Sequence, residues 1–181
     1  MTHRLAALFV AVMLVSLATS ILVAPSPTFA QSDGVQPEAI KISSLGIVAP
    51  VEVRTTVGGQ MQDPTGPDVV AWYDDSAPLD AGGNTVFSGH LDLAGYGPAI
   101  FAYLNRLERG DTIVARGAND EVFRYQVVWV RSYPARGSDW TALTGPTARE
   151  SITLITCAPP WDDATGHYAN RLVVRAKRIG G

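Results

Sequence analysis

Short runs in which apolar and polar residues alternate, separated by turn-forming residues, dominate this sequence and limit what it can fold into. We count eight such runs, at residues 39–42, 47–54, 69–72, 85–88, 112–116, 122–133, 152–157 and 172–179. Their period of two is typical of β-strands rather than of helices. Turn signals rich in Gly, Pro, Asn and Asp lie between them, in a chain with 17 Gly and 12 Pro residues. The pattern therefore predicts an all-β fold.

One segment breaks this pattern. Pro98 is suited to the start of a short helix, and Gly110-Asp111 would end it. Such a helix would carry on one face the residues Ile100, Phe101, Leu104 and Leu107. Many short strands with one helical insert favour a closed or nearly closed eight-stranded β-barrel, because closure leaves no long exposed strand edge.

The N-terminus is typical of an export signal. Arg4 precedes an apolar stretch without acidic residues, residues 5–23, and Thr28 and Ala30 provide small residues suited to cleavage after Ala30. The apolar stretch is also long enough to stay in place as a membrane anchor. We predict a signal peptide or N-terminal membrane anchor at 1–30, a linker at 31–37 and one folded domain at 38–181. This domain would be extracytoplasmic, either anchored to the cell membrane or secreted.

Charge and ligand content exclude two classes of partner. Without Arg4, the exported part has 13 Lys and Arg residues against 17 Asp and Glu residues, a net charge of 13 − 17 = −4. A nucleic-acid-binding domain would need a basic patch, so we expect no nucleic acid partner. One Cys and dispersed His residues do not form a set of metal ligands, so the sequence implies no metal and no other cofactor.

Cys157 is the only cysteine, although thiols tend to pair outside the cytoplasm. It is therefore either a buried apolar residue, half of an intermolecular disulfide, or a nucleophile. It ends the predicted strand 152–157, just before Pro159-Pro160, and alternation places it on the same face as Thr153 and Ile155.

Two further residues are candidates for chemistry. His90 follows the predicted strand 85–88, where it is either a structural histidine or part of a site at the strand end. Arg171 precedes the last predicted strand, 14 residues after Cys157, and the intervening segment is rich in turn formers. The chain can thus return so that Arg171 lies beside Cys157, although Arg171 also fits an ordinary solvated arginine.

Four segments in order resemble the sortase family. Thr153-Leu154-Ile155-Thr156-Cys157 is similar to the T-L-x-T-C signature, and Arg171-Leu172-Val173-Val174 to the R-L-V-V that follows it. Val86-Phe87-Ser88-Gly89-His90 resembles the segment around the catalytic histidine, and residues 101–111 resemble F-x-x-L-x-x-L-x-x-G-D. The resemblance extends from about residue 38 to residue 179. Residues 61–73, with Trp72-Tyr73, look most like the class E and F branch.

The resemblance implies a sortase-like barrel and a cysteine transpeptidase. Cys157 would attack an LPxTG-like sorting motif near the C-terminus of an exported protein and form a thioacyl enzyme. An amine of the cell envelope, such as a peptidoglycan precursor or a pilin lysine, would accept the acyl group, whereas water as acceptor would make the enzyme a hydrolase. His90 would act as acid and base, and Arg171 would stabilise the oxyanion or bind substrate carbonyls. Thr156 would orient the substrate or Arg171.

Two alternatives remain open at this point. An L,D-transpeptidase also uses Cys and His, but that family has Ser-His-Gly before its cysteine, where this chain has Thr156. A noncatalytic exported β-barrel binding module would use Cys157 as a core residue and Arg171 as a surface charge. Thiol accessibility would separate the last alternative from an enzyme.

Overall fold

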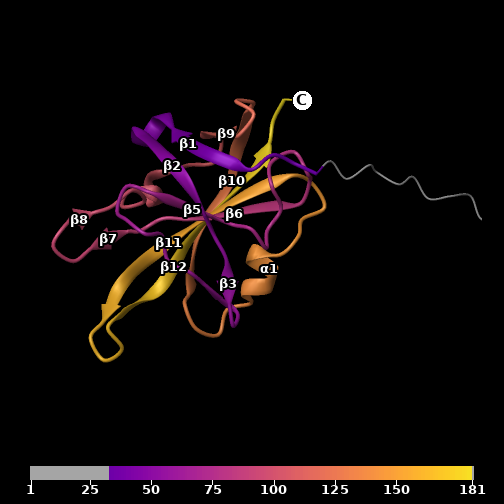
Figure 1. The fold of residues 1–181 in the computed structure, drawn as a ribbon. Coiled ribbons are helices and arrows are strands. Elements are labelled where there is room, and N and C mark those ends of the chain that lie inside the picture. The colour runs from indigo at the N-terminus through magenta and orange to yellow at the C-terminus, as the bar shows by residue number, and fades with distance from the viewer. Residues whose placement is uncertain (1–32, 181) are drawn as a thin grey trace, which may run out of the picture. The chain divides into compact units, whose positions relative to one another are not determined.

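Eight strands close into a barrel in the computed structural model, which describes residues 33–180 (Figure 1). The order around the barrel is β1-β2-β5-β6-β11-β12-β10-β9. Each barrel strand overlaps one predicted run, so the eight-stranded all-β barrel is confirmed. The strands are β1 (Pro37–Ile42), β2 (Ile47–Arg54), β5 (Val70–Tyr73), β6 (Asn84–Ser88), β9 (Thr112–Gly117), β10 (Val122–Pro134), β11 (Ser151–Asp162) and β12 (His167–Arg178).

Two pairs of neighbouring strands, β2–β5 and β6–β11, run parallel, and the other neighbours in the barrel are antiparallel. A parallel pair has both C-terminal ends at the same edge of the sheet. The β6–β11 pair therefore brings together two segments that are far apart in the sequence, the residues after Ser88 and the residues after Ile155.

The barrel is filled by a large apolar cluster that includes Phe87, Leu154 and Val174, all fully buried. A second cluster lies on the opposite face of the strands, because Ile155 and Val173 alternate with the main core residues Leu154 and Val174. We call this second set the outer-face cluster: Ala71, Tyr73, Val86, Leu143, Ile155 and Val173. Most of its members come from β5, β6, β11 and β12, so it forms an apolar floor on the outside of the barrel.

The predicted helix after Pro98 is only partly right. Pro98 belongs to β8 (Gly97–Pro98), which pairs with β7 (Asp92–Leu93), and the helical part is the 3₁₀ turn η2 (Leu104–Arg106). The amide of Ile100 donates to the Pro67 carbonyl, and that of Phe101 donates to the His90 carbonyl. The amides of Ala102, Leu104 and Leu107 each donate to the carbonyl three residues earlier, so the segment closes 3₁₀-type turns instead of an α-helix.

Besides the β7–β8 hairpin, the structure adds three small elements that the sequence pattern did not predict. They are the 3₁₀ turn η1 (Ser43–Leu45), the hairpin β3 (Thr56–Val57) with β4 (Gln60–Met61), and the helix α1 (Trp140–Thr144). Asp139 caps α1 by accepting from the amide of Ala142 at 3.0 Å. Figure 1 shows α1 and the β3–β4 hairpin near each other below the barrel.

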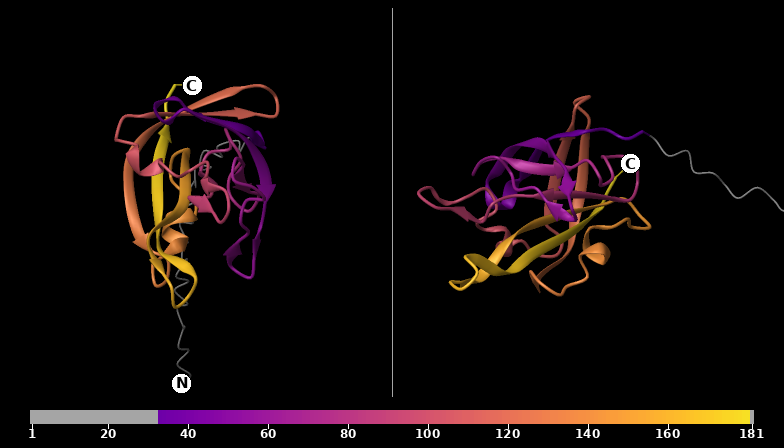
Figure 2. Two further views of the ribbon diagram at one scale, coloured as in Figure 1. Left: turned by 90° about the vertical axis from the view of Figure 1, so that its left-hand side faces the viewer. Right: turned by 60° about the horizontal axis from the view of Figure 1, so that its bottom comes forward.

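The strands that carry Cys157 and Arg171 are longer than predicted. β11 continues through Pro159-Pro160, and β12 begins at His167, so the turn between them is only residues 163–166. A register shift between Ala158 and Trp161 accommodates the two prolines. This part of the hairpin projects beyond the barrel (Figures 1 and 2), where the missing amide hydrogens of the prolines interrupt no further pairing.

The predicted signal peptide or anchor at 1–30, including the apolar stretch 5–23, lies outside the described residues. Part of the predicted linker 31–37 is structured, because Val35 exchanges backbone hydrogen bonds with Leu79 and β1 begins at Pro37. Residues 33–180 contain no helix with the length and hydrophobicity that a membrane span requires.

Candidate active site

Cys157 and Arg171 are direct register partners in the antiparallel β11–β12 pair. Tyr133 of β10 is the register partner of Arg171 on its other side. Directly opposed residues in antiparallel strands project to the same face, so the three side chains form a row across the sheet. The row lies on the face of the outer-face cluster, because Cys157 alternates two residues after Ile155.

His90 reaches the same end of the sheet through the parallel pairing of β6 with β11. Ser88 is the register partner of Ile155, and His90 and Cys157 each follow two residues later. The amide of Gly89 continues this pairing by donating to the Ile155 carbonyl at 3.1 Å. A Cβ atom at position 89 would come within 2.5 Å of the Phe101 ring, so glycine is what allows the chain to approach Phe101 here.

The His90 ring is held from the loop between β4 and β5. Its Nε2 lies 3.0 Å from the Pro64 carbonyl oxygen. A carbonyl only accepts, so Nε2 carries the hydrogen in this arrangement and Nδ1 is the acceptor of the neutral ring. In this structure the ring's hydrogen bond is therefore with Pro64 and not with the Cys157 thiol.

The loop that presents Pro64 is itself fixed to the barrel. The Tyr73 hydroxyl donates to the Gln62 carbonyl at 2.7 Å and lies 2.6 Å from Ser88 Oγ, which must then be the donor in that second bond. Burial raises the pKa of Tyr73 to about 12, so the hydroxyl keeps its hydrogen at any physiological pH. The contact thus joins the Pro64 loop to the strand that leads into His90.

Arg171 uses one nitrogen for the protein and has others left for a ligand. Its Nη1 donates to the carbonyls of Tyr168 at 3.0 Å and Asn170 at 2.9 Å. Within residues 33–180, neither Nε nor Nη2 of Arg171 makes a hydrogen bond to the protein. A half-buried guanidinium with unused donors beside a thiol can stabilise negative charge on an oxygen bonded to a carbon that the sulfur attacks.

Cys157 is a half-buried free thiol. Burial raises its pKa above the ordinary value, the Arg171 guanidinium acts in the opposite direction, and the carboxylates of Asp63 and Asp92 raise it further. Because the pKa lies above the ordinary value for cysteine, the resting group at neutral pH is the thiol. A base must therefore remove the proton when a substrate is attacked, and His90 is the candidate that the β6–β11 pairing brings to this end of the sheet.

The first prediction concerns this thiol. In full-length protein the rate of Cys157 alkylation by iodoacetamide should rise with pH to a midpoint above that of free cysteine in the same buffer. Removing a carboxylate makes the thiolate easier to form, so Asp63→Asn should lower the midpoint. Removing the guanidinium has the opposite sign, so Arg171→Met should raise it. A wild-type midpoint at or below that of free cysteine would contradict a resting protonated thiol.

Thr156 does not lie where the sequence analysis expected it to act. Its side chain is 3% exposed and belongs to the opposite face of β11 from Cys157, with a buried hydroxyl that has no hydrogen-bond partner. A peptide beside Cys157 has no access to this hydroxyl unless the strand opens. We therefore leave Thr156 out of the substrate-binding residues proposed below.

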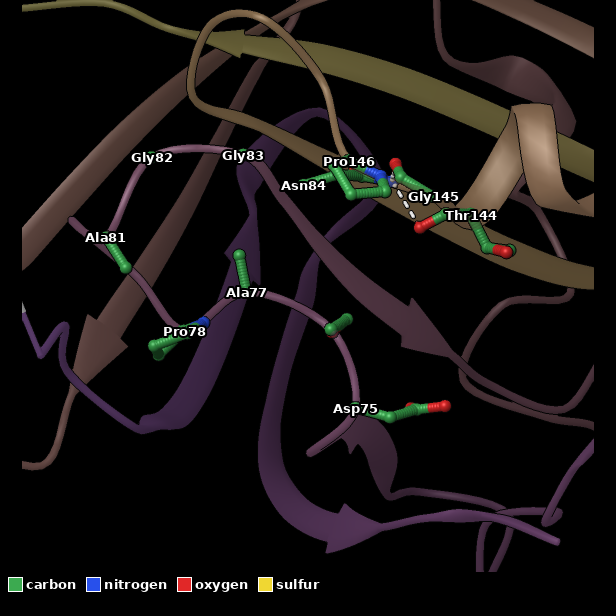
Figure 3. Close-up of a pocket in the computed structure, with 11 residues that line it drawn as sticks. Asp75, Ala77, Pro78, Ala81, Gly82, Gly83, Asn84, Thr144, Gly145 and Pro146 are labelled. Carbon is green, nitrogen blue, oxygen red and sulfur yellow. Dashed lines mark hydrogen bonds between the residues drawn. The ribbon is translucent and has the colours of Figure 1, made fainter. Parts of the chain in front are cut away.

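Two cavities lie between the elements around this outer face of the barrel. A cavity of about 140 Å³ opens between the β3–β4 hairpin and α1, and a larger one of about 290 Å³ lies between the loop 75–84 and residues 144–146 (Figure 3). The larger cavity is at the start of β6 and β11, the end opposite to His90 and Cys157. The two share a wall formed by Asp75, Ser76, Thr144 and Gly145.

The smaller cavity belongs to the same apolar face as the Cys157 row. Its lining includes Tyr73 and Val86, which pack with Ile155 and Val173 in the outer-face cluster. Asn84 supports the wall of this cavity at the end of α1. The Asn84 side-chain amide donates to the carbonyls of Thr144 and Gly145 at 3.0 and 3.2 Å. The smaller cavity and the Cys157 row therefore lie on the same outer face of the strands, although neither cavity is lined by Cys157, His90 or Arg171.

Several residues of this region were missed by sequence reasoning: Pro64, Tyr73, Asp92, Tyr133 and Tyr168. None carries a signal of a catalytic role in the linear sequence, because each reaches the site through the fold or through a backbone atom. Within the described part of the chain, no group of three or more His, Cys, Asp or Glu residues is arranged to hold a metal ion.

A family model and several solved structures that resemble this chain all point to the same family. A family model described as a sortase domain matches residues 40–179. A lid mutant of sortase A from Corynebacterium diphtheriae is similar in structure, with TM-score 0.60, 26% identity, and coverage of 80% of this chain and 70% of that one.

Two further solved structures have the same fold. Sortase C1 from Streptococcus agalactiae matches with TM-score 0.59, 26% identity, and coverage of 80% of this chain and 67% of that one. Sortase C-1 from Actinomyces oris matches with TM-score 0.61, 22% identity and coverage of 79% and 73%. A search of curated proteins finds no match.

Proposed function

The chain belongs to the sortase family, and from this premise we propose that it is an exported cysteine transpeptidase that cuts an LPxTG-like sorting motif. The observation that carries the proposal is the pairing of Cys157 with Arg171 at the strand end where the His90 segment emerges. The L,D-transpeptidase alternative loses its support, because the sortase domain spans almost all of the described residues.

The proposed reaction starts with attack of Cys157 Sγ on the carbonyl carbon of the scissile peptide bond. His90 takes the thiol proton and gives it to the leaving amine as the carbon–nitrogen bond breaks. The oxygen of the tetrahedral intermediate accepts hydrogen bonds from Nε and Nη2 of Arg171. The product of this half-reaction is a thioester between Cys157 and the part of the substrate before the cut.

In the second half-reaction an amine attacks the thioester. His90 removes a proton from the amine, the new amide bond forms, and the sulfur leaves as the thiol after taking back the proton. A peptidoglycan precursor or a pilin lysine would supply this amine, and water would give the hydrolysis product instead. The substrates are exported proteins with a sorting motif near their C-terminus, so the proposed location is the cell envelope, either membrane-anchored or secreted.

We propose that the outer face from the smaller cavity to the Cys157 row acts as a groove, which binds the apolar residues of the motif before the cut. Thr56 lines the smaller cavity, whereas the neighbouring Val57 points away from it and is 59% exposed. Thr56→Trp should fill the cavity and raise KM for a sorting peptide about tenfold, which is about 1.4 kcal/mol. kcat should stay close to that of the wild type.

The matched control for this prediction is Val57→Trp, which adds the same ring outside the cavity. Steady-state kinetics with a fluorogenic peptide should show an unchanged KM for this control. Equal KM values for the two variants would contradict binding in this groove.

The assignment to the class E and F branch is also part of the proposal. It rests on residues 61–73, with Trp72-Tyr73 before the histidine segment. The structures named above carry class A and class C names and have nearly equal TM-scores, so they do not separate the branches.

The transpeptidase activity is tested with full-length protein, a library of fluorogenic sorting peptides, and either an added amine or water alone. We expect cleavage of at least one motif, with an amide product at high amine concentration and a free carboxylate without amine. Absence of cleavage across the library would contradict the proposal and favour a noncatalytic binding module. Cleavage without any amide product would identify a hydrolase.

A further inference from the structure

The geometry points to Tyr168 as a positioning residue that holds the His90 segment and the Arg171 guanidinium in a single arrangement. Tyr168 lies in β12, three residues before Arg171, in the part of the hairpin that projects beyond the barrel. Its hydroxyl donates to Asp92 Oδ2 at 2.5 Å, and its carbonyl accepts from Arg171 Nη1 at 3.0 Å. The inference rests on the proposed function.

Asp92 begins β7 only two residues after His90, so this bond connects elements that lie 76 residues apart in the sequence. The His90 segment is also held by backbone hydrogen bonds. The Gly89 amide donates to β11, and the His90 carbonyl accepts from the Phe101 amide. Within residues 33–180, the Tyr168–Asp92 bond is the side-chain hydrogen bond that joins β7 to the strand of Arg171.

The Tyr168 side chain is itself held in place by its neighbours. Its ring packs edge-on against Trp161, its register partner in β11, with 5.1 Å between ring centroids. Donation to a carboxylate makes a stronger hydrogen bond than donation to a neutral oxygen. The same contact with Asp92 raises the pKa of Tyr168, as expected for a phenol that donates to a negative group.

Loss of the Tyr168–Asp92 hydrogen bond should affect the catalytic step more than substrate binding. His90 and Arg171 must act on the same carbonyl, and misplacement by about 1 Å can cost up to about a hundredfold in rate. Neither Tyr168 nor Asp92 lines the two cavities. Loss of the bond should therefore lower kcat and leave KM nearly unchanged.

The test uses full-length Tyr168→Phe, Asp92→Ala and the double variant. Phenylalanine keeps the ring against Trp161 and removes only the hydroxyl. We expect each single variant to lose about tenfold in kcat, with KM within about twofold, and the double variant to be no worse than either single one. Asp92→Asn keeps an accepting oxygen and should recover most of the loss.

The matched control is Tyr96→Phe. The Tyr96 hydroxyl also donates to an exposed carboxylate, Asp68 Oδ2 at 2.8 Å, but that bond does not reach β12. Its kcat should equal that of the wild type. Full kcat in Tyr168→Phe, an equal loss in Tyr96→Phe, or losses that multiply in the double variant would each overturn the inference.

Hydrogen–deuterium exchange separates failure of this inference from failure of the proposed function, because it needs no turnover. Peptides covering residues 89–93 should exchange faster in Tyr168→Phe than in the wild type, and those from β9 should not change. Unchanged exchange at 89–93 would contradict the link even in an active enzyme. An inactive wild type with faster exchange in the variant would retain the link and refute the proposed function.

Discussion

Cys157→Ala is expected to abolish cleavage of sorting peptides, with a loss of at least about a thousandfold in kcat/KM. The reason is chemical: alanine has no atom that can form the thioester, and within the chain there is no second cysteine to replace it. The side chain is only half-buried, so the change in the free energy of unfolding should stay below about 1.5 kcal/mol.

Fluorogenic peptide assays and thermal denaturation of full-length wild type and variant measure both effects. The matched control is Ser138→Ala, a small polar-to-alanine change in the loop before α1, which should keep wild-type activity. Substantial activity in Cys157→Ala would refute the thiol as nucleophile. Collapse of the fold in this variant would instead mark Cys157 as a packing residue.

Arg171→Lys is expected to lower kcat about a hundredfold, because removing one oxyanion donor typically costs at least that much. Lysine keeps the positive charge but loses the planar donor set. In the wild type, Nη1 binds the Tyr168 and Asn170 carbonyls, while Nε and Nη2 make no hydrogen bond within residues 33–180 and remain for the substrate oxygen. A single ammonium group does not reproduce both sets of bonds.

The thermal stability of Arg171→Lys should change far less than its kcat. Lys177→Arg, at the exposed end of the same strand, provides the reverse exchange as a control and should leave kinetics unchanged. Wild-type kcat in Arg171→Lys would make Arg171 a structural residue. A loss of kcat that is matched by general unfolding would lead to the same conclusion.

The barrel was predictable because strand alternation is a local signal. Each of the eight runs is short, bounded by turn formers and consistent with one buried face, and these features survive in the structure with shifts of a few residues. The helix after Pro98 was only partly right, because its apolar spacing does not reveal that the segment closes 3₁₀-type turns instead of an α-helix. The five-residue α1 is too short to show a helical period.

The candidate site was also predictable only in part. Cys157 and Arg171 could be placed together from the sequence, because a turn connects their strands directly. Pro159-Pro160 suggested that the strand ends at Cys157, whereas the register shift after Ala158 carries it through to Asp162. The position of His90 depends on the parallel pairing of β6 with β11, which follows from barrel closure and not from any segment alone.

The most direct measurement is mass spectrometry of the full-length protein after brief exposure to the peptide library without added amine. We predict an increase in mass equal to the part of the peptide before the cut, located on Cys157 by fragmentation and lost on addition of an amine. No adduct, or an adduct on another residue that persists in Cys157→Ala, would contradict catalysis by this thiol.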